Sequence, residues 1–284
     1  MTLRKIWLRS RDLLLDAGID DASLESEVLI RHLLGIDRAT FFANLGEVVH
    51  SPSLDGLDSL VLRRTGGEPL AYILGYKEFY GLDICVTQDV LVPRQETETL
   101  VEKVIEIGKE RGDSEMNVAD VGTGSGAIAV AIAHYLKSSR VNAIDVSKVA
   151  LDVADLNCRK HNVADRVVLT CSDLLDEIDE SFDVIVSNPP YISTDDIPQL
   201  SPEVGREPIQ ALDGGYNGTD VIRRLLGQAP RFLKPAGTIL LEINPPQLRQ
   251  TIAIARKKIP FSKPSYFKDL SGVARVVVIE TRGN

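Results

Sequence analysis

The sequence predicts an α/β protein with a mainly parallel β-sheet, preceded by a separate segment that is entirely helical. From residue 96 onward, short runs rich in β-branched residues alternate with amphipathic stretches of helical length, which is typical of a parallel sheet with helices on both faces. Residues 1–75 show helical periodicity only. A glycine-rich turn at residues 122–126 follows the first expected strand of the sheet, where nucleotide-like ligands bind in such proteins.

Residues 1–75 are expected to form a small bundle of helices. One face of the first helix is apolar and carries Leu3, Ile6, Trp7, Leu13 and Leu14. Capping residues at 20–23 start the second helix, Gly35 stops it, and further helices are expected at 39–45 and 54–64. Because this segment has no histidine cluster, carboxylate pair or glycine loop, we interpret it as a recognition domain. A packing appendage without a partner of its own is the alternative.

The remaining elements follow in chain order. Residues 76–95 are expected to form a β-hairpin linker, and residues 96–284 the α/β domain. Strands are predicted at 118–121, 141–146, 167–170, 182–187, 238–242 and 273–279, and helices at 96–109, 128–136, 149–160, 221–233 and 248–258. Ligands of parallel sheets bind at the carboxyl ends of the strands, so the residues directly after each strand are the candidate site residues.

The composition is normal for a soluble globular protein and disfavours several classes of function. The 284 residues carry a formal net charge of −9, which disfavours a partner held mainly by phosphate charge. No apolar run approaches the ~18 residues of a membrane helix, and the charged N-terminus is unlike a signal peptide. Cys85, Cys158 and Cys171 are too few and too far apart for a disulfide framework or a zinc site. We therefore expect a cytoplasmic protein without a metal site.

Three successive strand ends carry residues suited to a nucleotide-like ligand. The first is followed by a loop whose glycines let the backbone approach a ligand closely: Gly122, Thr123, Gly124, Ser125 and Gly126. Asp145, about 20 residues later, is placed to accept hydrogen bonds from ribose hydroxyls. After the third strand, Asp173 can accept a hydrogen bond from the exocyclic amine of an adenine, and Leu174 can cover the adenine ring. Taken singly, a tight turn, a helix cap and a turn aspartate are the alternatives.

The fourth strand ends in Asn188-Pro189-Pro190-Tyr191, a stiff loop because neither proline has an N–H for sheet pairing. Asn188 Oδ1 and the Pro189 carbonyl offer two acceptors, which suit the two N–H donors of a substrate –NH2 group. Such a nitrogen is a poor nucleophile, and acceptors on its hydrogens orient its lone pair toward an electrophile. Tyr191 supplies a ring wall. A purely structural Asn-Pro turn is the alternative.

These residues resemble those of class I S-adenosylmethionine-dependent N-methyltransferases. Further blocks at Gly66–Gly75, Lys77–Leu82, Val92–Glu98 and Glu207–Gly215 are similar to those of the release factor glutamine methyltransferases, also called PrmC or HemK. The similarity spans nearly the whole chain, including the helical segment. It implies a Rossmann-like, mainly parallel seven-stranded sheet. It also implies methyl transfer from S-adenosyl-L-methionine to the side-chain amide nitrogen, N5, of the glutamine in the Gly-Gly-Gln (GGQ) motif of bacterial peptide chain release factors.

The resemblance also assigns roles to individual residues. It places the cofactor against Gly122, Thr123, Gly124, Ser125, Gly126, Asp145, Asp173, Leu174 and Asn188. It assigns the substrate glutamine and the catalytic role to Asn188, Pro189, Pro190 and Tyr191, with Phe79 helping to line the site. The chain departs from the family pattern at Gln95, at Leu174 and at Asn244-Pro245-Pro246. None of these three departures touches the chemistry that the resemblance implies.

Two other functions share some of these motifs. A nucleic acid adenine N6-methyltransferase uses the same loop on a flipped base. It would need a basic groove and a target-recognition domain, against which the charge of −9 and the small helical segment argue. A non-catalytic protein that binds S-adenosylmethionine or a release factor is disfavoured by the intact loop at residues 188–191. We therefore expect an enzyme whose partner is a release factor, with no membrane partner and no direct nucleic acid substrate.

Overall fold

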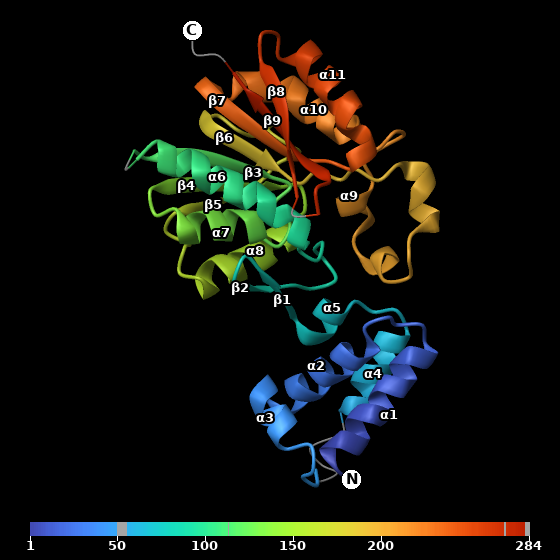
Figure 1. Ribbon diagram of the computed structural model, residues 1–284. Coiled ribbons are helices and arrows are strands. Elements are labelled where there is room, and N and C mark those ends of the chain that lie inside the picture. Colours follow the sequence, from blue (N-terminus) through green and yellow to red (C-terminus); the bar gives the residue numbers. More distant parts are fainter. Residues whose placement is uncertain (50–55, 113, 270, 282–284) are drawn as a thin grey trace. The chain divides into compact units, whose positions relative to one another are not determined.

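The structure is a computed structural model that describes residues 1–49, 56–112, 114–269 and 271–281. The chain forms two compact units, whose helices and strands are labelled in Figure 1. The smaller unit contains Met1–Gly75 and a short later segment, Ser201–Arg206, whereas the larger contains Tyr76–Leu200 and Glu207–Asn284. Residues 54 and 55, at the start of the fourth expected helix, lie outside the described residues.

The larger unit is built on a seven-stranded sheet with the strand order β5-β4-β3-β6-β7-β9-β8. The strands are β3 (Met116–Val121), β4 (Ser139–Asp145), β5 (Val167–Cys171), β6 (Phe182–Ser187), β7 (Leu233–Glu242), β8 (Lys263–Lys268) and β9 (Ala274–Glu280). From β5 to β7 neighbouring strands pair in parallel, and β9 pairs antiparallel with both β7 and β8. The predicted mainly parallel sheet is confirmed. The chain adds β4 and β5 on one side of β3 and then β6 on the other.

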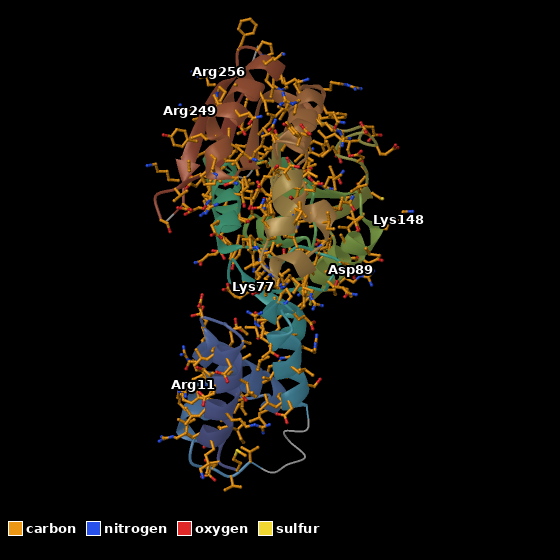
Figure 2. All side chains as sticks on the ribbon, turned by 90° about the vertical axis from the view of Figure 1, so that its right-hand side faces the viewer. Arg11, Lys77, Asp89, Lys148, Arg249 and Arg256 are labelled. Atoms are coloured by element: carbon orange, nitrogen blue, oxygen red, sulfur yellow. The ribbon has the colours of Figure 1, made fainter. Side chains whose placement is uncertain are left out.

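Helices cover both faces of this sheet (Figure 1). They are α6 (Glu98–Glu110), α7 (Ala127–Tyr135), α8 (Lys148–Lys160), α10 (Asp220–Gln228) and α11 (Leu248–Lys258). Buried side chains of α10 and α11 form one apolar cluster with β6, β7 and β9, which includes Ile222, Ile185 and Leu241. The solvent side of α11 is basic, as the exposed Arg249 and Arg256 show (Figure 2).

Two elements near the end of the chain differ from the sequence prediction. The helix expected at 221–233 ends at Gln228, because Pro230 lies in the short 3-10 turn that follows and has no N–H to donate. The chain then enters β7 at Leu233. Strand β8 was not predicted, because it is an edge strand with mostly exposed side chains and therefore shows no apolar alternation.

The expected hairpin consists of β1 (Tyr76–Phe79) and β2 (Leu82–Cys85), which pair antiparallel. Asn157 of α8 holds it in place. Its Oδ1 accepts from the Cys85 N–H at 2.7 Å, and its Nδ2 donates to the Cys85 carbonyl at 2.9 Å. The same Nδ2 donates to the carbonyl of Ser125 at 2.8 Å. One buried amide therefore ties the hairpin to the glycine loop after β3.

The smaller unit is helical, as the apolar periodicity predicted. Its described helices are α1 (Leu3–Asp16), α2 (Ala22–Leu34), α3 (Arg38–Ala43), α4 (Leu57–Thr65) and α5 (Leu70–Leu74). They enclose a core in which Leu14, Leu29 and Phe41 are fully buried. Helix α5 was not predicted, because a stretch bounded by Pro69 and Gly75 is too short to reveal a helical period. Within the described ranges, every helix is too short or too polar to cross a lipid bilayer.

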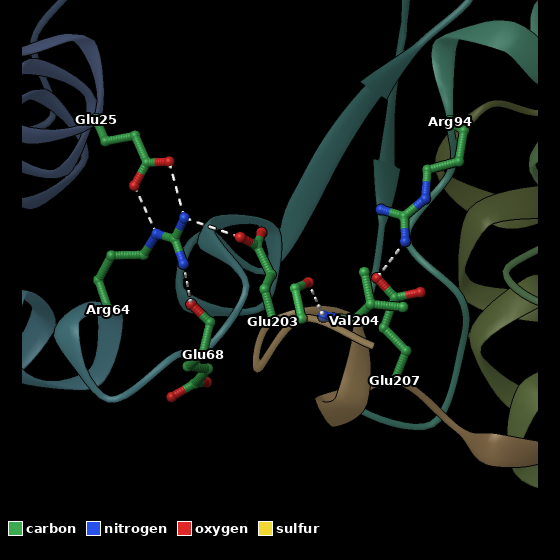
Figure 3. Close-up of polar contacts among 8 residues, drawn as sticks. Glu25, Arg64, Glu68, Arg94, Glu203, Val204 and Glu207 are labelled. Carbon is green, nitrogen blue, oxygen red and sulfur yellow. Dashed lines mark hydrogen bonds and ion pairs between the residues drawn. The ribbon is translucent and has the colours of Figure 1, made fainter. Parts of the chain in front are cut away.

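Arg64, at the end of α4, holds the segment Ser201–Arg206 in the smaller unit (Figure 3). Its Nε donates to Glu25 Oε2 at 2.5 Å, and its Nη2 donates to Glu203 Oε2 at 3.0 Å. Its Nη1 donates to the carbonyl of Glu68 at 3.2 Å. Only 6% of Arg64 is exposed, but the Glu203 side chain is 44% exposed and that of Glu25 14%, so the bond to Glu25 is the better shielded from water. The helical unit is therefore discontinuous in sequence, which no local pattern indicates.

Candidate active site

A cavity of about 550 Å³ opens at the carboxyl ends of β3, β4, β5 and β6. Sites for small molecules typically occupy roughly 300–1,000 Å³. Residues from all four strand ends line it, among them Gly122, Gly124, Asp145, Asp173, Leu174, Asn188 and Pro190. The cavity lies where strand order reverses around β3, which is the usual ligand position in open α/β sheets. The structure therefore brings these sequence-predicted residues together in one place.

The glycine loop between β3 and α7 leaves its backbone open to the cavity. Gly122 and Gly124 have φ angles of 76° and 56°, and a Cβ atom at either position would meet nothing within 4 Å. This open space permits the close approach of a ligand. Gly126 is required for another reason, because a Cβ there would lie 3.0 Å from Ala154 Cβ and would push α7 away from α8.

Thr123 and Ser125, the other residues of the loop, are buried and do not form part of the cavity wall. Thr123 Oγ1 donates to Asp120 Oδ2 at 2.6 Å, and the Ala129 N–H donates to the same oxygen at 3.1 Å. Burial raises the pKa of Asp120 to about 7. Sequence reasoning did not single out this carboxyl, which fixes the loop from beneath. Contacts of Thr123, Ser125 and Gly126 with a cofactor stay a prediction.

Asp145, at the end of β4, holds two turns at once. Its Oδ2 accepts from the Gly124 N–H at 2.8 Å, and its Oδ1 accepts from the Ser147 N–H at 2.9 Å. Burial raises the pKa of this carboxyl. Ser147, not Asp145, caps α8, since its side chain accepts from Ala150 N. A carboxylate has about four lone-pair positions, so two remain for the hydroxyls of a ligand in the cavity.

Asp173 and Leu174 follow β5 on another wall of the cavity. Asp173 Oδ2 accepts from Arg224 Nη2 at 2.7 Å in a half-exposed pair, which leaves Oδ1 for a ligand. Leu174 has a φ angle of 54°, a left-handed conformation that costs roughly 1–2 kcal/mol for a residue with a Cβ. Strained backbone of this kind is concentrated at functional sites. The strain places an apolar side chain at the cavity, where a ring could rest on it.

Asn188, at the end of β6, has its amide held by Thr97. Asn188 Nδ2 donates to Thr97 Oγ1 at 3.1 Å. Thr97 is buried and closes the 3-10 turn Gln95–Thr97 that leads into α6. The oxygen and nitrogen of an amide lie on opposite arms, so this bond turns Asn188 Oδ1 away from Thr97. Because Asn188 lines the cavity, Oδ1 is the atom that it offers to a ligand.

The other residues of the loop differ in their exposure. Pro190 lines the cavity, whereas Pro189 is buried, Tyr191 is partly buried, and neither of these two forms part of the cavity wall. Burial raises the pKa of Tyr191 to about 12, so its phenol stays neutral near physiological pH. Phe79 on β1 is 1% exposed, and the structure places it in the core instead of on the cavity wall. A role for Phe79 against a substrate is therefore not supported by its position.

A second loop, residues 213–218, supports Pro190 and Tyr191 from behind. A Cβ at Gly214 would lie 2.7 Å from the Pro190 carbonyl oxygen, and one at Gly218 would collide with the Tyr191 carbonyl. Gln247 Nε2 donates to that same carbonyl at 2.8 Å and to the Gly218 carbonyl at 3.1 Å. Sequence reasoning missed this support. The glycines mark only a turn, and the partners of Gln247 are backbone atoms distant in sequence.

Glu242, at the end of β7, is a further group that the sequence did not assign to the site. It is 1% exposed, and burial raises its pKa to about 7. A hydrogen bond from the Thr97 side chain and the nearby Arg275 oppose this rise. No cluster of three or more histidine, cysteine, aspartate or glutamate side chains in the described ranges is arranged to hold a metal ion.

Two family models match the chain. The PrmC N-terminal domain matches residues 6–75, and the methyltransferase small domain matches residues 96–203. A release factor glutamine methyltransferase of Geobacter sulfurreducens is 38% identical over 278 residues, which cover 97% of this chain and 95% of that protein. Another, from Moorella thermoacetica, is 39% identical over 275 residues, which cover 96% of each.

Solved structures match the fold. A methyltransferase from Pyrococcus furiosus has a TM-score of 0.51 at 20% identity, over 80% of this chain and 99% of that one. A 16S rRNA methyltransferase from T. thermophilus, solved with AdoMet and guanosine, has a TM-score of 0.53 at 16% identity, over 73% of this chain and 50% of that one. The expected class I methyltransferase fold is thereby confirmed. Because the chain is 38% and 39% identical to these two relatives along almost its entire length, it belongs to the release factor glutamine methyltransferase family.

Proposed function

We propose that the protein transfers a methyl group from S-adenosyl-L-methionine to the side-chain amide nitrogen, N5, of a glutamine in a bacterial peptide chain release factor. One observation carries this proposal: a glycine loop, two carboxylates and the Asn188 amide converge on a single cavity. Membership of the family supports the same class of substrate. The glutamine of the Gly-Gly-Gln motif is the proposed position of the modification.

The cavity offers a complementary group to each part of the proposed cofactor. The lone pairs of Asp145 that are not used by the backbone suit ribose hydroxyls, and Asp173 Oδ1 suits the adenine amine. Leu174 gives an apolar surface for the ring, and the open backbone at Gly122 and Gly124 lets the ligand approach closely. When bound, S-adenosylmethionine supplies an electrophilic methyl group on a sulfonium sulfur.

The loop after β6 is proposed to bind and orient the glutamine amide. Asn188 Oδ1 accepts one N–H of the substrate, and the Pro189 carbonyl accepts the other. With both hydrogens held, the nitrogen lone pair lies perpendicular to them and faces the methyl group. The ring of Tyr191 covers the amide and keeps water away from it.

No strong base is needed in this reaction. Asn188 and the Pro189 carbonyl would hold the amide nitrogen while the bound cofactor supplied the methyl group, and the methylated nitrogen would be cationic. It then loses one of its two protons readily, since an N-alkylated amide cation is a strong acid. Burial keeps Tyr191 protonated, with a pKa of about 12, so the residue acts as a neutral wall and not as the base.

Separate parts of the chain are proposed to serve chemistry and recognition. Every described residue that lines the cavity belongs to the larger unit: Asp89, Val90 and Leu91 come from residues 76–95 and the others from residues 96–284. We therefore assign methyl transfer to residues 96–284, with residues 76–95 as a linker that also contributes to the cavity wall. The described part of residues 1–75 contributes nothing to the cavity, and residues 1–75 are proposed to bind the release factor. A protein that modifies release factors works where they do, which places it in the cytoplasm.

Mass mapping of a methylated release factor tests the proposed function. The protein is incubated with methyl-labelled S-adenosylmethionine and a purified release factor, and the digest is searched for added methyl groups. We expect label on the glutamine of the Gly-Gly-Gln peptide alone. Parallel reactions contain a DNA duplex or tRNA. Label on adenine, with none on the release factor, would overturn the proposal in favour of a nucleic acid methyltransferase, and binding without any transfer would indicate a non-catalytic protein.

A further inference from the structure

Three polar side chains from separate elements form a continuous chain behind the cavity. Asn188, at the end of β6, donates from Nδ2 to Thr97 Oγ1 at 3.1 Å. The Thr97 side chain lies near enough to the Glu242 carboxyl, at the end of β7, to lower the pKa of that carboxyl by hydrogen bonding. Thr97 and Glu242 are only 4% and 1% exposed, so water hardly competes for these bonds.

The pleat of β7 explains why a carboxyl faces this chain. Ile239 and Leu241 belong to the apolar cluster formed with α10 and α11. Successive residues of a strand point to opposite faces, so Glu242 faces the other side of the sheet, where Thr97 precedes α6. Its Oε2 has no hydrogen-bond partner among the described residues. A buried acid that is only partly satisfied costs stability, which points to a role beyond packing.

The carboxylate sets the direction of every hydrogen bond in the chain. An ionised Glu242 can only accept, so the Thr97 hydroxyl gives its one hydrogen to Glu242. Thr97 Oγ1 then presents only lone pairs to Asn188. The Asn188 NH2 group therefore faces Thr97, and Asn188 Oδ1 is turned toward the cavity.

We propose that Thr97 and Glu242 are positioning residues that hold the Asn188 amide in the one orientation able to accept an N–H of the substrate. This inference rests on the proposed function, because it concerns the same glutamine amide. In the reversed orientation, Asn188 would present its own NH2 to the substrate NH2, and two donors would meet. Thr97 and Glu242 act through Asn188 and do not touch the substrate.

Charged and titratable groups face Glu242 from each neighbouring segment: Arg275 on β9, Glu96 and Arg94 ahead of α6, and the neutral phenol of Tyr191. Burial is the largest influence on Glu242 and raises its pKa to about 7. The two arginines lower this pKa and Glu96 raises it. The carboxyl is therefore balanced between its two protonation states near neutral pH.

Protonation of Glu242 removes the constraint on the Asn188 amide. A protonated Glu242 can donate to Thr97 Oγ1, and the hydroxyl hydrogen of Thr97 is then free to turn toward Asn188. That hydrogen favours the reversed amide, with Asn188 Oδ1 toward Thr97. We therefore expect the rate of methyl transfer to decline as the pH falls through about 7.

Single-turnover methylation of a release factor, at saturating cofactor, tests the role of Thr97. Thr97→Val keeps the shape and removes the hydroxyl, so the rate should fall roughly tenfold, the effect of one net hydrogen bond. Thr97→Ser keeps the hydroxyl and should restore most of the rate. Thr251→Val is the matched control, because the hydroxyl of this buried threonine has no partner among the described residues. Cofactor affinity and thermal unfolding of each variant separate loss of positioning from misfolding.

Glu242→Gln tests the pH dependence, and it also tests the positioning role if Thr97→Val does not fold. Glutamine does not titrate, so the variant should lack the decline that protonation of Glu242 causes between about pH 8 and about pH 6, whereas the wild-type rate should show it. Asp120, also with a pKa of about 7, is present in both proteins and affects them alike. A wild-type rate for Thr97→Val, or matching pH profiles, would overturn the positioning role and leave the proposed function standing. Absence of label from the wild-type reaction would overturn the proposed function itself.

Discussion

Single residues of the candidate site combine a structural task with a free polar group. Asp145 accepts the backbone N–H groups of Gly124 and Ser147, which fixes the glycine loop and the start of α8. Its other lone pairs remain for a ligand. Asn188 is divided in the same way, since its NH2 group is held by Thr97 and its oxygen is left for the proposed substrate amide. Holding one side of each group rigidly is what preorganises the other side.

Asp145→Ala should weaken the binding of S-adenosylmethionine. The ribose hydroxyls lose a charged acceptor, which is worth roughly 1.5–3 kcal/mol, and the loop loses the anchor at Gly124. Titration calorimetry measures the change. Asp152→Ala, at an exposed position of α8, is the control and should bind as the wild type does. Unchanged affinity in Asp145→Ala would remove Asp145 from the site.

Glu242 is retained at a cost in stability that depends on pH. Its pKa is raised from an ordinary 4.5 to about 7 in the folded protein, so the folded state binds this proton more tightly than the unfolded chain does. That contribution to stability is complete below about pH 4.5 and is lost as the pH rises through about 7. Glu242→Gln should therefore gain stability relative to the wild type over this window, on the order of 3 kcal/mol by about pH 8. Chemical denaturation of both proteins at about pH 4.5 and at about pH 8 measures this difference in stability. A difference that does not change with pH would contradict a buried, titrating carboxyl.

The sequence indicated the site residues that directly follow strands, and missed those that act through tertiary contacts. Asp145 and Asn188 stand at strand ends, and the alternation of strands and helices alone implies that such ends meet at one edge. Thr97 and Gln247 carry no such signal, because their partners lie far away in the chain. Glu242 does stand at a strand end, but nothing in its local sequence indicates that Thr97 lies beside it. Only the folded backbone makes them neighbours of the site.

At the scale of secondary-structure elements, the position of the loop after β6 depends on a second loop. Gly214 and Gly218 bring the backbone of residues 213–218 against Pro190 and Tyr191 more closely than any side chain would permit. The central strands were predictable because they are buried runs of β-branched residues. The packing of residues 213–218 was not predictable, because the glycines indicate a turn without indicating what the turn packs against.

Gly214→Ala should destabilise the larger unit and slow methyl transfer. The added Cβ would lie 2.7 Å from the Pro190 carbonyl oxygen and 2.8 Å from Tyr191 Cα, and overpacking of this kind costs roughly 1–3 kcal/mol. Gly227→Ala on α10 is the matched control, since its Cβ would meet nothing closer than Lys258 Nζ at 3.5 Å. In a helix that change should stabilise by up to about 1 kcal/mol. If denaturation finds both variants equally stable, the close packing of the two loops is wrong.

At the scale of the whole molecule, the helical unit includes a segment from the middle of the methyltransferase sequence. Arg64 binds Glu25 of α2 and Glu203 of that segment while almost fully buried. Deletion of residues 1–75 would leave Ser201–Arg206 without these partners. The role of the helical unit is therefore better tested by a substitution inside it than by its removal.

Arg64→Ala should weaken the helical unit and spare the cofactor site. It leaves the largely buried Glu25 unpaired, at a cost of roughly 3 kcal/mol, whereas Arg63→Ala breaks an exposed pair with Glu68 worth about 1 kcal/mol at most. Calorimetric unfolding measures stability, and titration should show unchanged cofactor affinity for both variants. Methylation of whole release factor should fall in Arg64→Ala, while a short Gly-Gly-Gln peptide should be methylated as before. Equal losses on both substrates would make the unit a structural support and not a recognition domain.

The proposed methyl transfer depends on Asn188 as the acceptor that orients the substrate amide, and a kinetic comparison of three proteins examines this role. The quantity compared is the single-turnover rate of release factor methylation, at saturating cofactor, for Asn188→Ala beside Asn188→Asp and the wild type. Asn188→Ala removes the acceptor and should lower the rate roughly 10²–10³-fold, as expected when one preorganised polar contact to a transition state is lost. Asn188→Asp keeps an acceptor oxygen and should retain part of the activity. A wild-type rate for Asn188→Ala would reduce the loop to a structural turn and contradict the mechanism.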